Sequence, residues 1–175
     1  MTHHLAAVFF DLGDTILIEE SEVKNTEGTT LGADLIPGIA DALRHFKVQG
    51  LPLALVADSR PNTPPNVLRQ HGLYELFAYL AISEVIGANK PDSPIFRAAL
   101  DALGIPPSDY RRVVMVGNNV ERDVVGANRL GLISVLFHWN DRRRSQPFTD
   151  EERPRYTVSS AHELISLIDD LDHHD

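Results

Sequence analysis

Short apolar runs that alternate with helix-like segments constrain the fold of this chain more than any other feature. Runs of strand length cover residues 5–10, 51–57, 79–83, 112–116 and 132–137, and residues 156–158 could add a short edge strand. Continuous apolar runs of this length are typical of strands covered on both faces. Their alternation with helices implies parallel strands joined by right-handed crossovers.

The segments between these runs carry helix-end signals. Ser93 is expected to cap a helix, another helix is expected from about residue 121 to residue 130, and Ser160 with Glu163 forms a capping box for the last helix. Residues 138–155 are polar and irregular. The sequence therefore predicts an α/β fold, a Rossmann-like three-layer α/β/α sandwich whose mainly parallel sheet has five to six strands.

The composition limits the classes of protein to consider. A chain of 175 residues is the size of one domain, so we expect a single core over residues 1–175. A net charge of −9 argues against a surface that grips nucleic acid or anionic lipid, and the absence of cysteine excludes disulfides and thiolate chemistry. No apolar run reaches the roughly 18 residues of a membrane helix, and no signal peptide is evident. We expect a cytoplasmic protein that binds neither nucleic acid nor membrane.

Polar side chains follow the expected strands, and ligands bind at the carboxyl ends of strands in such sheets. Asp11 follows the first strand, Asp58 the second and Lys90 the third, whereas Asn118 and Asp123 follow the fourth. Two carboxylates such as Asp11 and Asp123 can hold Mg²⁺, which prefers oxygen ligands. A nearby ammonium can neutralise a phosphate oxygen, and a carboxylate can attack phosphorus. This sparse set suffices for phosphoryl transfer, which depends mostly on positioning and charge neutralisation.

Four short motifs in this order resemble those of the haloacid dehalogenase superfamily over nearly the whole chain. VFFDLGDTI resembles the family's first motif, an apolar strand that ends in Asp-x-Asp-x-Thr. LALVADS and ANKPDSPIF are similar to its second and third motifs, and GNNVERDVVGA is similar to its fourth. The resemblance implies a Mg²⁺-dependent phosphatase that works through an aspartyl-phosphate intermediate.

The resemblance also implies roles for individual residues. Asp11 would be the nucleophile and a Mg²⁺ ligand, together with the main-chain carbonyl of Gly13. Lys90 would neutralise Asp11 and the phosphoryl group, and Asp123 would complete the metal site directly or through water. Asn118 would be a further metal ligand through its amide oxygen. The expected phosphate-binding residues are Asp58, Ser59, Lys90 and Asn118.

The chain departs from the family pattern at three positions. Gly13 stands where the family has the aspartate that acts as general acid, and Asp14 lies one residue later. In an extended segment its side chain would point the opposite way, but this rule is weaker in a sharp turn, so Asp14 stays open as a candidate catalytic residue. Losing a general acid costs on the order of 10²- to 10⁴-fold in rate, least with a good leaving group. Asn118 replaces a metal-binding aspartate, which predicts weak Mg²⁺ affinity, and Ala57 replaces a Thr or Ser.

The gaps between motifs are too short for the separate cap domain of many relatives. About twenty residues separate Asp14 from Pro37, and the roughly thirty residues between Ser59 and Lys90 are taken up by one helix and one strand. The resemblance therefore implies an open site. An open site fits a large or unselective phosphorylated substrate, or a second copy of this chain that covers the site.

Other functions remain to be weighed against phosphatase activity. A non-catalytic relative could bind a phosphorylated ligand or a partner protein through the same residues. Carbon–halogen hydrolysis also uses an aspartate nucleophile, but those relatives need a cap. A phosphorelay receiver has its aspartate after a middle strand, so the motif order argues against it. The run at 142–144 is typical of a solvated loop, with recruitment of an anionic substrate as the alternative.

Overall fold

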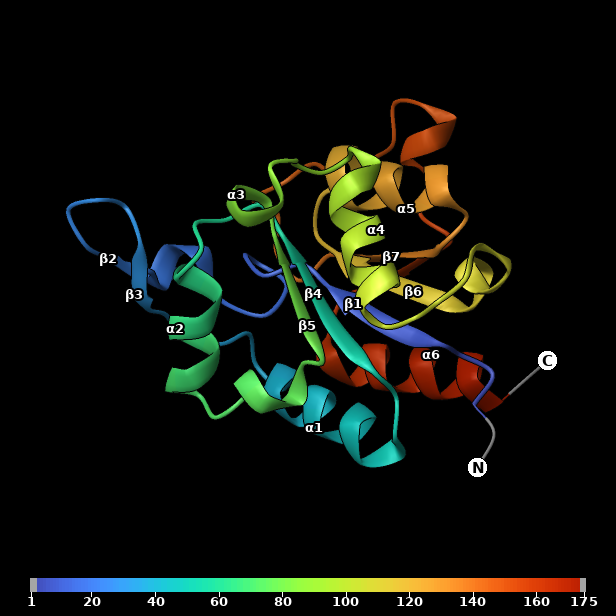
Figure 1. The fold of residues 1–175 in the computed structure, drawn as a ribbon, viewed down its shortest axis with the longest axis horizontal. Helices are drawn as coiled ribbons and strands as arrows, with labels where there is room; N and C mark the ends of the chain where they lie inside the picture. Colours follow the sequence, from blue (N-terminus) through green and yellow to red (C-terminus); the bar gives the residue numbers. More distant parts are fainter. Residues whose placement is uncertain (1–2, 174–175) are drawn as a thin grey trace.

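A computed structural model describes residues 3–173 and contains one six-stranded parallel sheet (Figure 1). The strand order is β5-β4-β1-β6-β7-β8. The bounds are β1 Ala7–Phe10, β4 Leu53–Ala57, β5 Tyr79–Ile82, β6 Val113–Gly117, β7 Ile133–Phe137 and β8 Tyr156–Val158. From β1 the chain extends the sheet first through β4 and β5, and then on the other side through β6 to β8. The α/β sandwich predicted from the sequence is confirmed, including its short edge strand.

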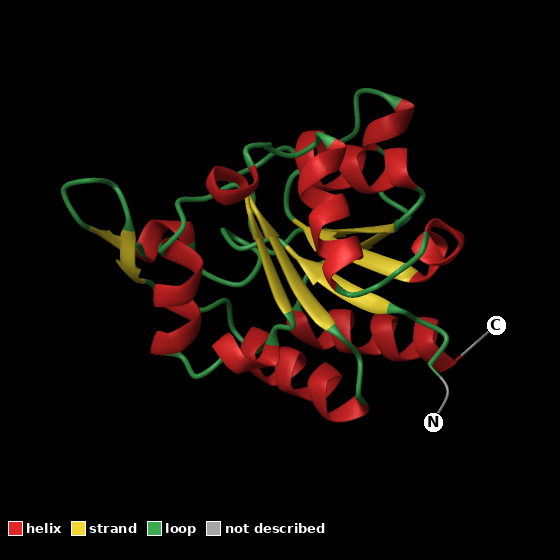
Figure 2. Ribbon diagram, viewed as in Figure 1, coloured by secondary structure: helices red, strands yellow, loops and turns green. Residues whose placement is uncertain are grey.

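Helices cover both faces of the sheet because successive side chains of each strand point to opposite faces (Figure 2). Val8 and Phe10 of β1 belong to one core with residues of α1 (Ile39–Gln49) and α6 (Ala161–His173). Ala7 and Phe9 belong to a second core with α4 (Ser93–Ala102) and α5 (Val125–Leu130). All four side chains of β1 are fully buried, which explains the continuous apolar run.

The remaining helices are short. They are α2 (Thr63–Gln70), α3 (Ser83–Ile86), the 3₁₀ turns Glu19–Ser21, Tyr74–Leu76, Pro107–Arg112 and Asp150–Glu152, and the π-helical turn η4 (Val120–Val124). No helix within the described residues 3–173 is long and apolar enough to span a membrane.

Three details of the helix predictions need correction or refinement. Ser93 is the first residue of α4 and not its cap, because Asp92 holds the extended backbone that precedes the helix. The helix expected at 121–130 begins instead with the π-helical turn η4, so only its second half is α-helical. Ser160 Oγ accepts the hydrogen bond from Glu163 N as predicted, but the Glu163 carboxylate returns to Ser159 N.

A small antiparallel hairpin follows the first strand and projects beside α2 (Figure 1). It consists of β2 (Val23–Lys24) and β3 (Thr30–Gly32). Side chains of α2 hold its backbone: Thr63 Oγ1 accepts from Thr30 N at 3.0 Å, and Asn66 Nδ2 donates to Thr30 O at 2.9 Å. The hairpin is therefore a fixed wall beside the carboxyl end of the sheet.

Candidate active site

A cavity of about 220 Å³ opens at the carboxyl ends of β1, β4 and β6, where the strand order of the sheet reverses. This is the position at which open parallel sheets bind their ligands. The residues predicted for the site that line it are Asp11, Gly13, Asp58, Ser59, Lys90, Asn118 and Asp123. Asp14 does not line the cavity. The fold thus brings together all but one of the predicted site residues.

Lys90 lies between the two aspartates that follow neighbouring strands. Its Nζ is 2.7 Å from Asp11 Oδ1 and 2.7 Å from Asp123 Oδ1. Lys90 and Asp123 are almost fully buried, with 5% and 2% of their surface exposed. Within residues 3–173, the second oxygen of Asp11 accepts only one long hydrogen bond, at 3.3 Å from Thr15 Oγ1, so this oxygen is the one available for nucleophilic attack.

The three charges do not balance, and the pKa values of Lys90 and Asp123 are shifted. Burial by itself lowers the pKa of Lys90, but the charges of Asp11 and Asp123 outweigh burial and raise it overall, so Lys90 stays protonated. Burial raises the pKa of Asp123 to about 6, and the neighbouring Asp11 adds to the rise while Lys90 opposes it. One ammonium therefore serves two carboxylates, and the site retains negative charge.

Asp58 holds the backbone of Lys90 and forms an ion pair with Arg122. Its Oδ1 accepts from Lys90 N at 2.9 Å, and its Oδ2 is 3.3 Å from Arg122 Nη1. Ser59 N donates to Ser83 Oγ at 2.9 Å, which ties the end of β4 to the start of α3. Among the residues that the structure describes, the side chain of Asn118 has no hydrogen-bond partner, so its amide is available to a ligand.

The π-helical turn η4 carries Asp123 back against the end of β6. A Cβ at Gly117 would lie 2.2 Å from Asp123 Cγ, so only glycine allows this approach. Asn119 caps the turn by accepting hydrogen bonds from Glu121 N and Arg122 N, and Asn119 N donates to Asp123 Oδ2 at 3.0 Å. π-helical turns of this kind are frequent at functional sites.

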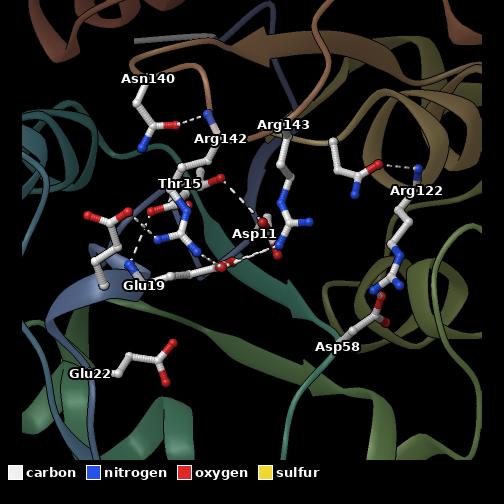
Figure 3. A network of polar contacts seen from close by, with 12 residues as sticks. Asp11, Thr15, Glu19, Glu22, Asp58, Arg122, Asn140, Arg142 and Arg143 are labelled. Atoms are coloured by element: carbon white, nitrogen blue, oxygen red, sulfur yellow. Dashed lines mark hydrogen bonds and ion pairs between the residues drawn. The ribbon is translucent and has the colours of Figure 1, made fainter.

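Glu19 fills the space next to Gly13, where the family pattern has an aspartate. A Cβ at Gly13 would lie 2.5 Å from Glu19 Oε1. Glu19 is held by two arginines from the loop after β7, with Arg142 Nη2 at 3.2 Å and Arg143 Nη2 at 3.0 Å (Figure 3). An aspartate at position 13 would therefore collide with this ion-paired carboxylate.

Asp14 has a structural environment. It is fully buried, its φ of 49° is left-handed, and its Oδ1 accepts from Glu19 N at 3.1 Å. Arg142 Nε lies 2.9 Å from its Oδ2. Burial raises the pKa of Asp14, although the hydrogen bond from Glu19 N opposes the rise. The side chain thus fixes the turn after β1.

Several cavity residues were missed by sequence reasoning. They are Glu19, Glu22, Lys24, Thr30, Arg60, Arg122 and Arg143. Most of them lie on the hairpin segment or on loops, where no periodicity marks a residue. Arg143 belongs to the run interpreted as a solvated loop, yet it reaches Glu19. The arginine run was the one signal available in the sequence.

The oxygen donors of the cavity fit a hard divalent cation. Asp11 and Asp123 supply more negative charge than Lys90 neutralises, and Gly13 and Asn118 add neutral oxygens. No cluster of three or more His, Cys, Asp or Glu side chains suited to a metal occurs within residues 3–173. This donor set suits Mg²⁺, which keeps several water ligands and is held by one or two carboxylates.

Comparison with known proteins identifies the family. A sequence model of haloacid dehalogenase-like hydrolases matches residues 28–131, which is more than half of the chain. The chain belongs to the haloacid dehalogenase-like hydrolase family. The family resemblance is thereby confirmed; the matched residues include the second, third and fourth motifs and begin after the first. Residues of all four motifs line the cavity of this haloacid dehalogenase-like hydrolase.

Relatives of this haloacid dehalogenase-like hydrolase include a protein named as a pyrimidine 5′-nucleotidase and one named as a phosphoserine phosphatase. The chain is 41% identical over 101 residues to pyrimidine 5′-nucleotidase YjjG of Escherichia coli, covering 58% of the chain and 42% of that protein. It is 34% identical over 131 residues to phosphoserine phosphatase of Thermus thermophilus, covering 75% and 50%. The chain thus spans about half the length of the relatives that it matches.

A solved structure shows the same fold. The HAD phosphatase from Thermococcus onnurineus superposes with a TM-score of 0.76 at 18% identity, over 94% of this chain and 98% of that one.

Proposed function

We propose that this hydrolase is a Mg²⁺-dependent phosphatase that forms a phosphoaspartate on Asp11. The observation that carries the proposal is the Asp11–Lys90–Asp123 group at the carboxyl end of the sheet, in which Lys90 and Asp123 are buried and Asp11 is partly exposed. It is supported by the phosphoserine phosphatase relative. Lys90 binds a phosphoryl oxygen of the substrate, and Asp11 provides the nucleophile.

The proposed reaction has two displacements at phosphorus. The carboxylate of Asp11 attacks the phosphorus, the bond to the leaving-group oxygen breaks, and that oxygen takes a proton from solvent. Water then attacks the phosphorus of the phosphoaspartate and loses a proton to solvent. The bond between phosphorus and the Asp11 oxygen breaks, which releases inorganic phosphate and restores the Asp11 carboxylate. Lys90 donates hydrogen bonds to Asp11 and to a phosphoryl oxygen throughout, which neutralises charge in both steps.

Asp11, Asp123, Asn118 and the carbonyl of Gly13 would hold Mg²⁺. The ion would neutralise the charge that develops on the phosphoryl oxygens. Asp123 already accepts hydrogen bonds on both oxygens, from Lys90 and from Asn119 N, so it would reach the ion mainly through water. Asn118 would bring no charge to the ion, which would weaken Mg²⁺ binding.

The segment after β1 supports the proposal of a single core without a sizeable cap. It holds only a 3₁₀ turn and the hairpin β2–β3, and this hairpin is fastened to α2. A single core would leave the site open to solvent or to a second copy of the chain. A cytoplasmic location is a further part of the proposal.

The test is turnover of p-nitrophenyl phosphate with and without MgCl₂. Asp11→Asn should reduce kcat by at least about 10³-fold, because the nucleophile is lost, and EDTA should abolish turnover. Asp101→Asn, on the exposed face of α4, is the matched control and should match the wild type. Equal turnover by Asp11→Asn and the wild type would disprove the nucleophile assignment.

The crowding at Gly13 favours one alternative. Position 13 carries no acid, and an aspartate there would have to displace the ion-paired Glu19 carboxylate. The alternative is that the protein binds a phosphorylated ligand without turning it over. Saturable binding of phosphate monoesters without any hydrolysis, even of activated aryl and acyl phosphates, would select this alternative.

A further inference from the structure

The charged side chains that line the cavity are arranged almost entirely as ion pairs. Arg143 pairs with Glu19 at 3.0 Å, and Arg122 pairs with Asp58 at 3.3 Å. Lys24 of the hairpin lies 3.1 Å from Glu22, which also accepts a hydrogen bond from Thr30 Oγ1. Each of these cations is neutralised before any ligand enters, so none of them gives the cavity a net positive charge.

Two places in the cavity are not neutralised. At the end of β1 and β6, two carboxylates share the single ammonium of Lys90, which leaves negative charge for a divalent cation. At the mouth, Arg60 lines the cavity, and within residues 3–173 its guanidinium has neither an ion-pair partner nor a hydrogen-bond partner. The carboxylates of Asp11 and Asp123 would therefore attract a cation, and the guanidinium of Arg60 would attract an anion.

The backbone of the hairpin gives Arg60 its position. A Cβ at Gly28, between β2 and β3, would lie 3.4 Å from Arg60 Nε, so the guanidinium lies close against this glycine. The hairpin cannot easily move away from Arg60, because Thr63 and Asn66 of α2 hold the backbone of Thr30. Arg60 itself lies in the short loop between β4 and α2, and its guanidinium packs against this fastened hairpin.

We propose that Arg60 is a specificity-determining residue that binds a second anionic group of the substrate, a carboxylate or a second phosphate. The inference rests on the proposed function, since it takes the first phosphate to lie at Asp11 and Lys90. A guanidinium matches either anion with two parallel hydrogen bonds. Asp11, Lys90 and Arg60 line the same cavity of about 220 Å³, so a molecule that is phosphorylated at one end and acidic at the other can contact all three.

The binding test uses phosphonates, which lack the ester bond and are not consumed. Propylphosphonate has a neutral tail, 3-phosphonopropionate ends in a carboxylate, and ethylene-1,2-diphosphonate ends in a second phosphonate. Each class is also measured with a tail two methylenes longer, so that both anions can reach their partners. Calorimetry in MgCl₂ gives Kd for the wild type, Arg60→Met, Arg60→Lys and the control Arg97→Met, which alters an exposed arginine of α4.

We expect an acidic tail to tighten binding to the wild type by about 5- to 10-fold, the size of one solvent-exposed charged contact. Arg60→Met should reduce this advantage to less than about 2-fold and leave propylphosphonate unchanged. Arg60→Lys should keep part of the advantage, and Arg97→Met should keep all of it. The tail that loses more in Arg60→Met identifies the anion as carboxylate or phosphate.

Two results would overturn the inference: no advantage of an acidic tail at either length, or an advantage that survives in Arg60→Met. Failure of the proposed function has a different signature, because it is read from p-nitrophenyl phosphate. A protein that shows the Arg60-dependent preference but turns over no phosphate ester would be a binding protein with the inferred specificity.

Discussion

Two almost fully buried aspartates, Asp123 and Asp172, lie at opposite ends of the sheet and differ in how their negative charge is neutralised. Asp123, at the carboxyl end, shares Lys90 with a second carboxylate, and burial together with Asp11 raises its pKa to about 6. Asp172 of α6 lies at the amino end of β1, where it accepts hydrogen bonds from Leu5 N at 2.9 Å and from His3 Nδ1 at 2.6 Å. Burial of Asp172 favours the neutral acid, but these hydrogen bonds outweigh it and lower its pKa.

The difference distinguishes a candidate functional residue, Asp123, from a structural residue, Asp172, which fastens the last helix to the start of β1. At Asp172 the negative charge has partners of its own, so the aspartate joins the start of β1 to the last helix and nothing is left for a ligand. At Asp123 the charge is only partly neutralised, and such uncompensated buried charge marks functional sites. Stability and chemistry therefore use the same residue type at the two ends of one sheet.

The largest effect is expected when Lys90 is removed. Lys90→Met leaves the buried carboxylate of Asp123 and the partly buried carboxylate of Asp11 without their shared cation, and loss of one partner of a buried ion pair destabilises by about 3–5 kcal/mol. Urea unfolding measures the loss. Lys47→Met, on the exposed face of α1, should stay within about 0.5 kcal/mol of the wild type.

The pH dependence of the Lys90→Met variant sharpens the comparison. An aspartate whose folded pKa lies above its unfolded value binds more protons when folded, so stability falls as pH rises through that interval. Without Lys90 this slope should steepen at Asp123, and the variant should be most stable at low pH. A variant that is as stable as the wild type at pH 7 would show that the two carboxylates do not depend on Lys90.

The next effect concerns the missing acid. In a Glu19→Ala background the space beside Gly13 is open, and Gly13→Asp then restores the aspartate of the family pattern. We expect the double variant to hydrolyse alkyl phosphates on the order of 10²-fold faster than Glu19→Ala alone, because a poor leaving group needs a proton. Aryl phosphates should gain little, which a plot of rate against leaving-group pKa would show.

The single variant Gly13→Asp is the control for this gain. Its Cβ collides with Glu19, so it should gain nothing and lose stability. An equal gain in the single and the double variants would mean that Glu19 does not block the position.

Replacing Gly117 should affect turnover as well as stability, whereas a matched replacement in the core should affect stability alone. Gly117→Ala places a Cβ 2.2 Å from Asp123 Cγ and must displace that carboxylate, at a cost of about 1–3 kcal/mol and with loss of turnover. Gly126→Ala collides with the ring of Phe96 at 2.3 Å and should cost similar stability. Turnover per folded molecule should fall in the first variant and persist in the second, as measured at a temperature where both are folded.

The features that could be predicted from the sequence are those that a short stretch of neighbouring residues determines. The strands, their parallel arrangement and the positions of Asp11, Lys90 and Asp123 follow from apolar runs and from residues at their ends. These features depend on a few neighbouring residues and on the rule that ligands bind at the carboxyl ends of strands.

Features that depend on distant contacts could not be predicted. The π-helical turn depends on the close approach of Asp123 to Gly117, and the role of Glu19 depends on arginines more than a hundred residues away. Arg60 was overlooked because its significance lies in the absence of a partner, which only the arrangement of the surrounding cavity reveals.

The smallest expected effect tests Asp172, the fastening at the other end of the sheet. Its folded pKa is lowered, so its ionised form stabilises the fold above the unfolded value of about 3.9, and this contribution is lost as pH falls through the folded pKa. Asp172→Asn keeps an acceptor for Leu5 N but loses the charge, which should cost about 1 kcal/mol at neutral pH and flatten the acid limb of the stability profile. Turnover of p-nitrophenyl phosphate should be unchanged. If Asp172→Asn reduced kcat, the two ends of the sheet would be coupled, and the division between fastening and site would be wrong.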